Sequence, residues 1–334
     1  MLWIQFATCA ALIVVAGYQL SYYDDVLAEK SGLGRSWIGA VLLASVTSLP
    51  ELVTGVSAVA FVGAPDLAVG GILGSCLFNL LLLALLDLVY QPGPALRDAH
   101  EGQTLSAALS IVLIGLASVR VFAGNAWNEL TIGWIAPTSI VILIAYLVGQ
   151  RLIFRFEQRR MAQVFAEHAQ TYAHITTRRA VAIFSGAALA IVGLGIWLSF
   201  PGDEIARATG LDASFVGNVF LAITTSLPEV VVTISAARMK AVDLAVGNLF
   251  GSNLFNIAIL AVYDFVYLPG SIWHAVAPIH IVAGIGAMAM TAIAIVSLTY
   301  RASTKIFFRI SWDSGLLIAV YAINLGLLFV LGSR

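Results

Sequence analysis

Long apolar stretches alternate with short polar turns along the whole of this sequence. A helix needs roughly 20 mostly apolar residues to cross a bilayer, and ten stretches satisfy this requirement. They are predicted to be transmembrane helices at residues 2–20, 36–62, 66–90, 103–122, 130–150, 180–200, 211–237, 242–268, 277–298 and 312–332. The longest polar stretch, residues 151–179, contains six arginines and is expected to be a linker or helical connector outside the bilayer. We therefore expect an all-α polytopic membrane protein.

The composition supports this class. Of the 334 residues, 60% are hydrophobic and only 10% are charged, whereas a soluble domain has about 25% charged residues. Cys9 and Cys76 both fall in apolar stretches, so neither a disulfide framework nor a zinc site is expected. We find no nucleophile–base pair and no metal motif, and we expect neither an enzyme nor a resident cofactor. No nucleic-acid partner is expected; protein partners are left open.

The distribution of Lys and Arg predicts the orientation of the chain. If the N-terminus is outside, 14 of the 17 Lys and Arg residues lie on the cytoplasmic side and three on the outer side. Cytoplasmic loops of membrane proteins are enriched in these residues. We therefore expect both termini outside and the 151–179 segment in the cytoplasm, in a protein of the cell (inner) membrane.

Two parts of the sequence are copies of one another. Residues 39–57 match residues 217–235, and residues 66–93 match residues 243–270. The matched parts are the second and third predicted helices, and then the seventh and eighth. Because an offset of five crossings is odd, the second copy is expected to lie upside down relative to the first. Inverted repeats with a binding site near the bilayer midplane are typical of secondary transporters.

The duplication divides the chain into three parts. We predict ten transmembrane helices arranged as two inverted five-helix repeats, joined by a cytoplasmic linker. The boundaries are 1–150 for the first repeat, 151–179 for the linker and 180–334 for the second repeat.

Each copy contains a glutamate deep inside an apolar stretch. The pentapeptide Thr-Ser-Leu-Pro-Glu occurs at residues 47–51 and again at residues 225–229. An ionised side chain at the bilayer centre costs about 2.5–3.5 kcal/mol on insertion scales, and neither stretch contains a Lys or Arg. The adjacent proline has no N–H, so a backbone carbonyl loses its helical partner. Carboxylate, hydroxyl and carbonyl oxygens suit Ca²⁺, and the charge of −2 on Glu51 and Glu229 matches one divalent ion.

Other oxygen atoms of the two copies are expected to face the same pocket. The helix that follows each glutamate contains a serine and an asparagine, Ser75 with Asn79 and Ser252 with Asn256. The two residues of each pair are four positions apart, which places them on one helical face. Two asparagines in these pairs have an alternative role as hydrogen-bonding contacts between helices. The candidate ligands are the carboxylates of Glu51 and Glu229, the hydroxyls of Ser48, Ser226, Ser75 and Ser252, the amides of Asn79 and Asn256, and the carbonyls of Ala44, Thr47, Ala222 and Thr225.

Four aspartates also recur between the copies. Asp66 and Asp243 open their predicted helices and are expected to be N-caps. Asp87 and Asp264 lie near the ends of the same helices. For them we favour a capping or solvated role over a role in lining the mouth of an ion pathway.

The paired motifs resemble the α-repeats of the sodium/calcium exchanger family, within the cation/Ca²⁺ antiporter superfamily. These motifs are Thr-Ser-Leu-Pro-Glu and Gly-Ser-x-Leu-Phe-Asn, the latter at 74–79 and 251–256. The resemblance implies a Ca²⁺ site made by Glu51, Glu229 and the carbonyls of Thr47 and Thr225. It implies Na⁺ sites around Ser48, Ser226, Ser75, Ser252 and the carbonyls of Ala44 and Ala222. Asn79 and Asn256 occupy the matching amide or carboxylate positions.

The expected function is secondary antiport of Ca²⁺ against Na⁺ by alternating access. This chain departs from the family pattern at Val46 and Thr224, where glycine is usual, and many members have an acidic residue at one of the positions of Asn79 and Asn256. With both of these neutral, we expect fewer than the three Na⁺ that some relatives move. H⁺ as the counter-ion and another divalent cation as cargo remain alternatives. A cation channel is disfavoured because channels usually build a symmetric pore from several subunits or repeats.

Overall fold

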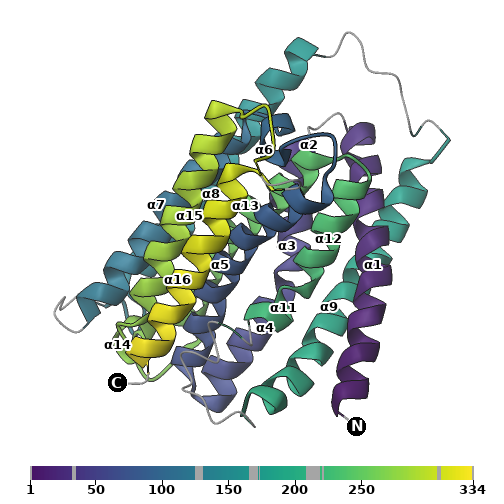
Figure 1. The fold of residues 1–334 in the computed structure, drawn as a ribbon. Helices are drawn as coiled ribbons and strands as arrows, with labels where there is room; N and C mark the ends of the chain where they lie inside the picture. Colours follow the sequence, from purple (N-terminus) through teal and green to yellow (C-terminus); the bar gives the residue numbers. More distant parts are fainter. Residues whose placement is uncertain are drawn as a thin grey trace.

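The computed structural model describes residues 2–31, 35–124, 131–164, 172, 174–207, 219, 222–306 and 310–332. This part of the chain forms a bundle of helices (Figure 1). Two short π-helical segments are named η1 and η2. In chain order they are α1 (Leu2–Ser31), α2 (Arg35–Ile38), η1 (Gly39–Leu43), α3 (Ala44–Thr47), α4 (Leu49–Ser57), η2 (Ala58–Val62), α5 (Pro65–Val89), α6 (Ala95–Asp98), α7 (Gln103–Ala123), α8 (Pro137–Val164), α9 (Thr177–Arg207), α11 (Ala222–Thr225), α12 (Leu227–Arg238), α13 (Val242–Val266), α14 (Ile272–Ala275), α15 (His280–Tyr300) and α16 (Trp312–Gly332).

Seven of the described helices are long and apolar enough to cross a membrane, namely α5, α7, α8, α9, α13, α15 and α16. The pair formed by η1–α3 and α4–η2 passes the same test as one unit, and bends by 41° between Thr47 and Leu49. Pro50 explains the bend, because its ring removes a helical hydrogen bond and collides with the preceding turn. The all-α class is therefore confirmed. The count of ten crossings stays a prediction, since most of residues 208–221 lie outside the described part.

The helix predicted at 130–150 begins later than expected, at Pro137. Just before it, Ile132 and Ile135 form an isolated antiparallel bridge around a turn. Proline is favoured in the first turn of a helix because a backbone N–H at that position would have no helical partner. At its other end α8 continues to Val164, so the first half of the polar 151–179 segment is helical.

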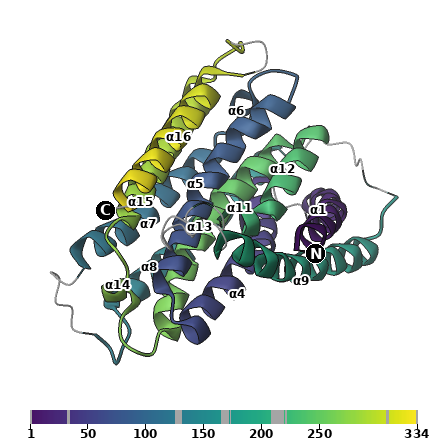
Figure 2. The same ribbon diagram turned by 60° about the horizontal axis from the view of Figure 1, so that its bottom comes forward.

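The helices α5 and α13 cross in the middle of the bundle and run in opposite directions. Figure 1 shows α5 leading to α6 at one end, whereas α13 leads to α14 at the other. The broken helices α3–α4 and α11–α12 pack against these two. The pair α1 and α9 covers one side of this centre, and α7, α8, α15 and α16 cover the other (Figure 2).

The two ends of the bundle can be named from the chain. Helix α1 begins and helix α16 ends at the same end, where α14 also lies (Figure 1). We call this the terminal end. The helix α6, the last turn of α8 and the first turn of α9 lie at the opposite end.

Two glycines let α13 approach the broken helix closely. A Cβ atom at Gly39 would lie 2.6 Å from the carbonyl oxygen of Leu244, and one at Gly251 would collide with the backbone of Ala40. Glycine is required where backbones approach this closely. The approach places the polar face of α13 beside Thr47, at the break.

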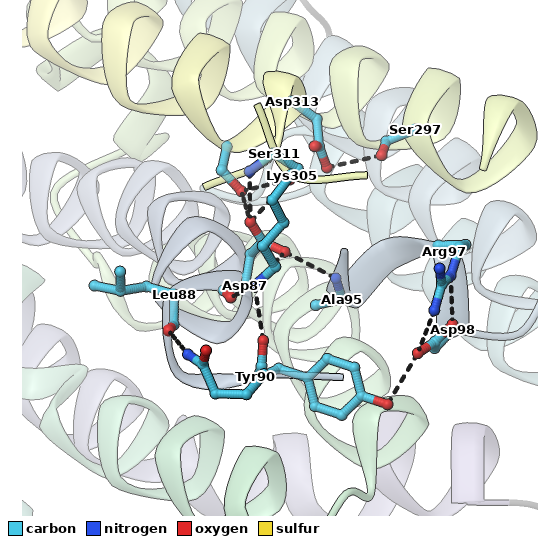
Figure 3. Close-up of polar contacts among 12 residues, drawn as sticks. Asp87, Leu88, Tyr90, Ala95, Arg97, Asp98, Ser297, Lys305, Ser311 and Asp313 are labelled. Atoms are coloured by element: carbon cyan, nitrogen blue, oxygen red, sulfur yellow. Dashed lines mark hydrogen bonds and ion pairs between the residues drawn. The ribbon is translucent and has the colours of Figure 1, made fainter. Parts of the chain in front are cut away.

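Asp87, near the end of α5, ties three segments together (Figure 3). Its carboxylate accepts hydrogen bonds from the N–H of Ala95 at 2.8 Å, from the N–H and the hydroxyl of Ser311, both at 2.8 Å, and from the hydroxyl of Ser314 at 3.1 Å. Lys305 forms an ion pair with the carboxylate at 3.4 Å and also donates to the backbone carbonyl of Asp87. Asp87 is buried, and its carboxylate caps the starts of α6 and α16.

Asp264 makes an equivalent set of bonds at the terminal end. It accepts from the N–H groups of Ala136 and Ile272, both at 2.8 Å, and from the hydroxyls of Ser139 at 2.6 Å and Ser271 at 3.0 Å. Each aspartate therefore joins the end of a central helix to the short helix after it and to the start of a peripheral helix.

The prediction that Asp66 and Asp243 cap their own helices is wrong. Each is the second residue of its helix, and its carboxylate turns to another segment. Asp66 accepts from the N–H of Ala277 at 2.7 Å and lies 2.9 Å from Nε2 of His280. Asp243 accepts from the N–H of His100 at 2.6 Å. Each carboxylate therefore binds the segment just before a neighbouring helix, which is α15 for Asp66 and α7 for Asp243.

Candidate cation site

Glu51 and Glu229 lie in the first turn of helices that follow a break in the chain. Ser48 interrupts the first helix with φ −93° and ψ 7°, and Ser226 interrupts the second with φ −86° and ψ 13°. A proline occupies the second position of each new helix, where no N–H is needed. The helix N-terminus, with its free N–H groups and positive dipole, favours a nearby negative charge. Both carboxylates are buried, with exposed fractions of 4% and 0%.

Each glutamate is hydrogen-bonded by the serine of the other copy. The Ser226 hydroxyl donates to Oε1 of Glu51 at 3.0 Å, and the Ser48 hydroxyl donates to Oε1 of Glu229 at 3.2 Å. Ser75 on α5 joins the first pair, at 3.1 Å from the Ser226 hydroxyl and 3.5 Å from the Glu51 carboxylate. Because the partners come from opposite halves of the chain, the two carboxylates form one site.

The second oxygen of each carboxylate has no hydrogen-bond partner. Oε2 of Glu51 and Oε2 of Glu229 are both buried and unpaired. None of the ion pairs between described residues involves either glutamate. Burying unpaired charge is costly, so a cation bound between the two glutamates would stabilise this arrangement.

The carbonyls of Ala44 and Ala222 are already used inside their own turns. The oxygen of Ala44 accepts hydrogen bonds from the N–H of Ser48 at 3.1 Å and from the hydroxyl of Thr47 at 3.3 Å. Equivalent bonds of 3.0 and 3.3 Å reach the oxygen of Ala222, the latter from Thr225. A carbonyl oxygen has two lone pairs, and both are used here. The Thr47 hydroxyl must therefore turn away before the Ala44 carbonyl can bind an ion, and the Thr225 hydroxyl before the Ala222 carbonyl can.

Ser252 lies beside α3 and not beside a glutamate. The Thr47 hydroxyl is 3.5 Å from the Ser252 hydroxyl and donates to the amide oxygen of Asn248 at 3.3 Å. This geometry differs from that of Ser75, which contacts Glu51 directly. The two halves of the site are therefore not identical.

Asn79 and Asn256 take part in contacts between α5 and α13. The Asn79 amide donates to the amide oxygen of Asn253 at 3.1 Å, and Asn253 donates to the carbonyl of Cys76 at 3.2 Å. Asn256 is buried near Cys76, and neither polar atom of its amide has a hydrogen-bond partner among the described residues. The structure thus brings three of the four predicted serines to the glutamates, namely Ser48, Ser75 and Ser226. It places Asn79 in a contact between the two central helices.

Two residues of the site were not among the sequence candidates. Asn248 accepts from Thr47, and the Tyr263 hydroxyl donates to the backbone carbonyl of Glu51 at 2.7 Å. A signal for both is present in the sequence, because each differs from its counterpart in the first copy. Asn248 corresponds to Gly71, and Tyr263 corresponds to Leu86.

Among the described residues, no group of three or more His, Cys, Asp and Glu side chains converges as a metal site. In the part of the chain that the structure describes, the acidic part of the candidate cation site consists of Glu51 and Glu229. Its remaining polar groups are neutral hydroxyls and amides, which bind hard cations such as Ca²⁺ and Na⁺ through oxygen.

Comparisons with known proteins give one consistent result. The profile of the family described as "Sodium/calcium exchanger protein" matches residues 1–152 and 179–330. The inner membrane protein YrbG of Escherichia coli is 28% identical over 272 residues, which are 78% of this chain and 78% of that protein. The uncharacterized membrane protein MJ0091 of Methanocaldococcus jannaschii is 25% identical over 248 residues, 74% of this chain and 76% of that protein.

A solved structure shares the fold. A structure of the sodium-calcium exchanger NCX_Mj matches with a TM-score of 0.73 at 20% identity, covering 98% of this chain and 99% of that one. The family profile covers both copied segments and leaves out most of the polar connection between them. The chain belongs to the sodium/calcium exchanger protein family, a family of membrane ion exchangers.

Proposed function

We propose that this chain is a secondary antiporter that exchanges Ca²⁺ for Na⁺ by alternating access, at a site built on Glu51 and Glu229. One observation carries the proposal. Two buried carboxylates, each bonded by a serine from the opposite half of the chain, keep one unpaired oxygen apiece. This arrangement supports a site that binds and releases cations, because no ion pair among the described residues neutralises either carboxylate.

The charge of the site supports the choice of ions. One Ca²⁺ neutralises the charge of −2, and it takes about 6–8 oxygen ligands at about 2.3–2.6 Å. Two Na⁺ would balance the same charge, whereas a third would leave the site at +1. Since Asn79 and Asn256 are neutral, we propose that fewer than three Na⁺ exchange for each Ca²⁺.

The arrangement of the central helices supports alternating access. Helices α5 and α13 occupy equivalent positions in the two copies and run in opposite directions (Figure 1). Their caps, Asp87 and Asp264, make equivalent bonds at opposite ends of the bundle. We therefore propose that residues 1–150 and 180–334 form inverted repeats that open the site to each side in turn.

We also propose that the protein resides in the cell membrane with its terminal end outside. The name of the inner membrane protein YrbG supports the location. The excess of Lys and Arg in the loops of the opposite end supports the orientation.

Exchange of Ca²⁺ for H⁺ is the second candidate function. The observation that favours it is the unpaired Oε2 atom of each glutamate, which is free to take a proton. In that mechanism two protons on Glu51 and Glu229 would replace the two Na⁺. Another divalent cation as cargo is a further alternative with the same site.

Ca²⁺ flux into proteoliposomes tests the proposal. Purified protein is reconstituted into vesicles loaded with Na⁺ or with K⁺, at the same pH on both sides, and ⁴⁵Ca²⁺ uptake is measured. We expect uptake into Na⁺-loaded vesicles only. Uptake that ignores Na⁺ and follows an imposed pH gradient supports Ca²⁺/H⁺ exchange instead. Uptake that needs no counter-ion supports a channel.

A further inference from the structure

Tyr263 contacts the cation site without being one of its ligands. The side chain is buried, and its hydroxyl donates a 2.7 Å hydrogen bond to the backbone carbonyl of Glu51. The same hydroxyl covers Gly55, one turn further along α4, so that a Cβ atom at that position would overlap with it. Tyr263 therefore holds the backbone of α4 at the residue that carries the carboxylate.

The side chain lies between the site and the terminal end of the bundle. Helix α4 runs from Glu51 past Gly55 towards that end, and Tyr263 is three residues before the last residue of α13, which ends there. A cavity of about 10 Å³ lies at this position, lined by Glu51, Thr54, Gly55, Ala68, Gly71, Ile72, Thr225 and Tyr263. Such a volume admits about one water molecule, so it has no room for an ion that keeps its shell of water molecules.

The other half of the protein is built differently at the equivalent place. By the offsets between the copies, Tyr263 corresponds to Leu86 and Gly55 corresponds to Thr233. Leu86 is buried and has no hydroxyl to donate, and Thr233 has a side chain where Gly55 has none. The bond to the glutamate backbone thus belongs to one half only, although the neighbouring residues Asp87 and Asp264 make equivalent caps.

We propose that Tyr263 is the positioning residue that closes the cation site towards the terminal end, and that its bond to Glu51 must break when the site opens there. This inference rests on the proposed exchange function. Opening towards the opposite end requires no equivalent break. The hydrogen bond therefore biases the protein against the state that is open at the terminal end.

Removal of the hydroxyl gives a result that depends on the side of the membrane. In Tyr263→Phe the state open at the terminal end becomes more populated, and apparent affinity follows the population of the competent state. A hydrogen bond of ordinary strength corresponds to roughly a 2- to 10-fold change. The Ca²⁺ concentration for half-maximal exchange should fall by this factor at the terminal end and rise at the opposite end.

The test uses ⁴⁵Ca²⁺/Ca²⁺ exchange in right-side-out and inside-out membrane vesicles of the full chain. Tyr321→Phe, which removes the hydroxyl of a buried tyrosine on α16, is the matched control and should behave as the wild type. Gly55→Ala is a second variant. The added methyl group forces the Tyr263 hydroxyl away from Glu51. This variant should therefore show the same two changes as Tyr263→Phe, a fall at the terminal end and a rise at the opposite end.

A fall in the Ca²⁺ concentration for half-maximal exchange at the terminal end together with a rise at the opposite end supports the inference, and the reverse pattern would overturn it. Equal shifts in both types, or none, in Tyr263→Phe and Gly55→Ala would overturn it while wild-type exchange continues. If the wild type itself gives no Na⁺-dependent Ca²⁺ flux, the proposed function fails, and the inference fails with it.

Discussion

At the scale of single residues, the chemistry centres on two carboxylates that have hydroxyl partners but no counter-charge among the described side chains. Ser226 and Ser48 each use one oxygen of a glutamate and leave the other unpaired. Serine hydroxyls both donate and accept. The serines that donate to the carboxylates are therefore able to rotate and offer an oxygen to a bound ion.

Neutralising either glutamate should abolish Ca²⁺ exchange. Removal of one partner from a buried charge pair costs about 3–5 kcal/mol, so Glu51→Gln and Glu229→Gln should each slow ⁴⁵Ca²⁺ exchange by roughly 100-fold or more. Glu101→Gln changes a carboxylate that is 73% exposed and serves as the control. Wild-type rates in both site variants would mean that these glutamates do not bind the transported ion.

Loss of the hydroxyl of Ser48 or of Ser226 should weaken exchange less than loss of a glutamate, and by a similar amount in each case. Each hydroxyl contacts one carboxylate, and a hydrogen bond to a charged group is worth about 1.5–3 kcal/mol. We expect Ser48→Ala and Ser226→Ala each to raise the Na⁺ concentration for half-maximal Ca²⁺ efflux by roughly 10-fold or more. The exposed Ser185 on α9 provides the control substitution to Ala. An effect in only one of the two variants would contradict a site shared between the two halves.

The sequence predicted the two glutamates and their serines because both copies repeat the same pentapeptide. It did not predict that each serine bonds the glutamate of the other copy, since such a contact depends on how the two halves pack. It missed Tyr263 because a tyrosine in an apolar helix resembles any other core residue. The partners of Asp66 and Asp243 were predicted wrongly, because local sequence does not reveal which neighbouring segment offers a free N–H.

At the scale of elements, buried aspartates hold the helix ends in place. Asp87 joins α5, α6 and the start of α16 (Figure 3), and Asp264 joins α13, α14 and the start of α8. On α6, the guanidinium of Arg97 hydrogen-bonds the carboxyl of Asp98 and lowers its pKa. The corner between α5 and α7 is thus fixed by a network of charged groups.

Replacing either capping aspartate by asparagine should destabilise the protein. The amide turns one acceptor oxygen into a donor that faces other N–H or O–H donors, and a buried unsatisfied group costs about 1–3 kcal/mol. We expect Asp87→Asn and Asp264→Asn to lower the temperature of thermal unfolding of the detergent-solubilised protein. Asp98→Asn, at a partly exposed carboxyl, should change it less. Equal stability of all three variants would argue against the capping role.

At the scale of the whole molecule, the terminal end is expected to face outward. Single cysteines introduced at residues 123–127 should react with impermeant thiol reagents in intact cells, and cysteines at 160–175 should react only after lysis. The native Cys9 and Cys76 are buried, which keeps the background low. The reverse pattern of labelling would contradict the orientation and leave the fold unchanged.

Hydrophobic length predicted most of the helices of the bundle, because a bilayer sets the same minimum length for every crossing. It placed the start of α8 too early, since the apolar residues 131–136 form a turn before Pro137. It did not predict that α1 continues to Ser31, past Asp24 and Asp25, whose side chains are buried. Burial of these acids depends on packing between helices, which hydropathy does not register.

The most direct test of the account is competition between Ca²⁺ and Na⁺ for the purified protein. Equilibrium binding of ⁴⁵Ca²⁺ in detergent should show one site per chain, displaced by Na⁺ with a Hill coefficient of about 2 and not by K⁺. Binding should be lost in Glu51→Gln and Glu229→Gln and kept in Glu101→Gln. Ca²⁺ binding that is indifferent to Na⁺, or that survives in both glutamate variants, would contradict a single shared site for the two ions.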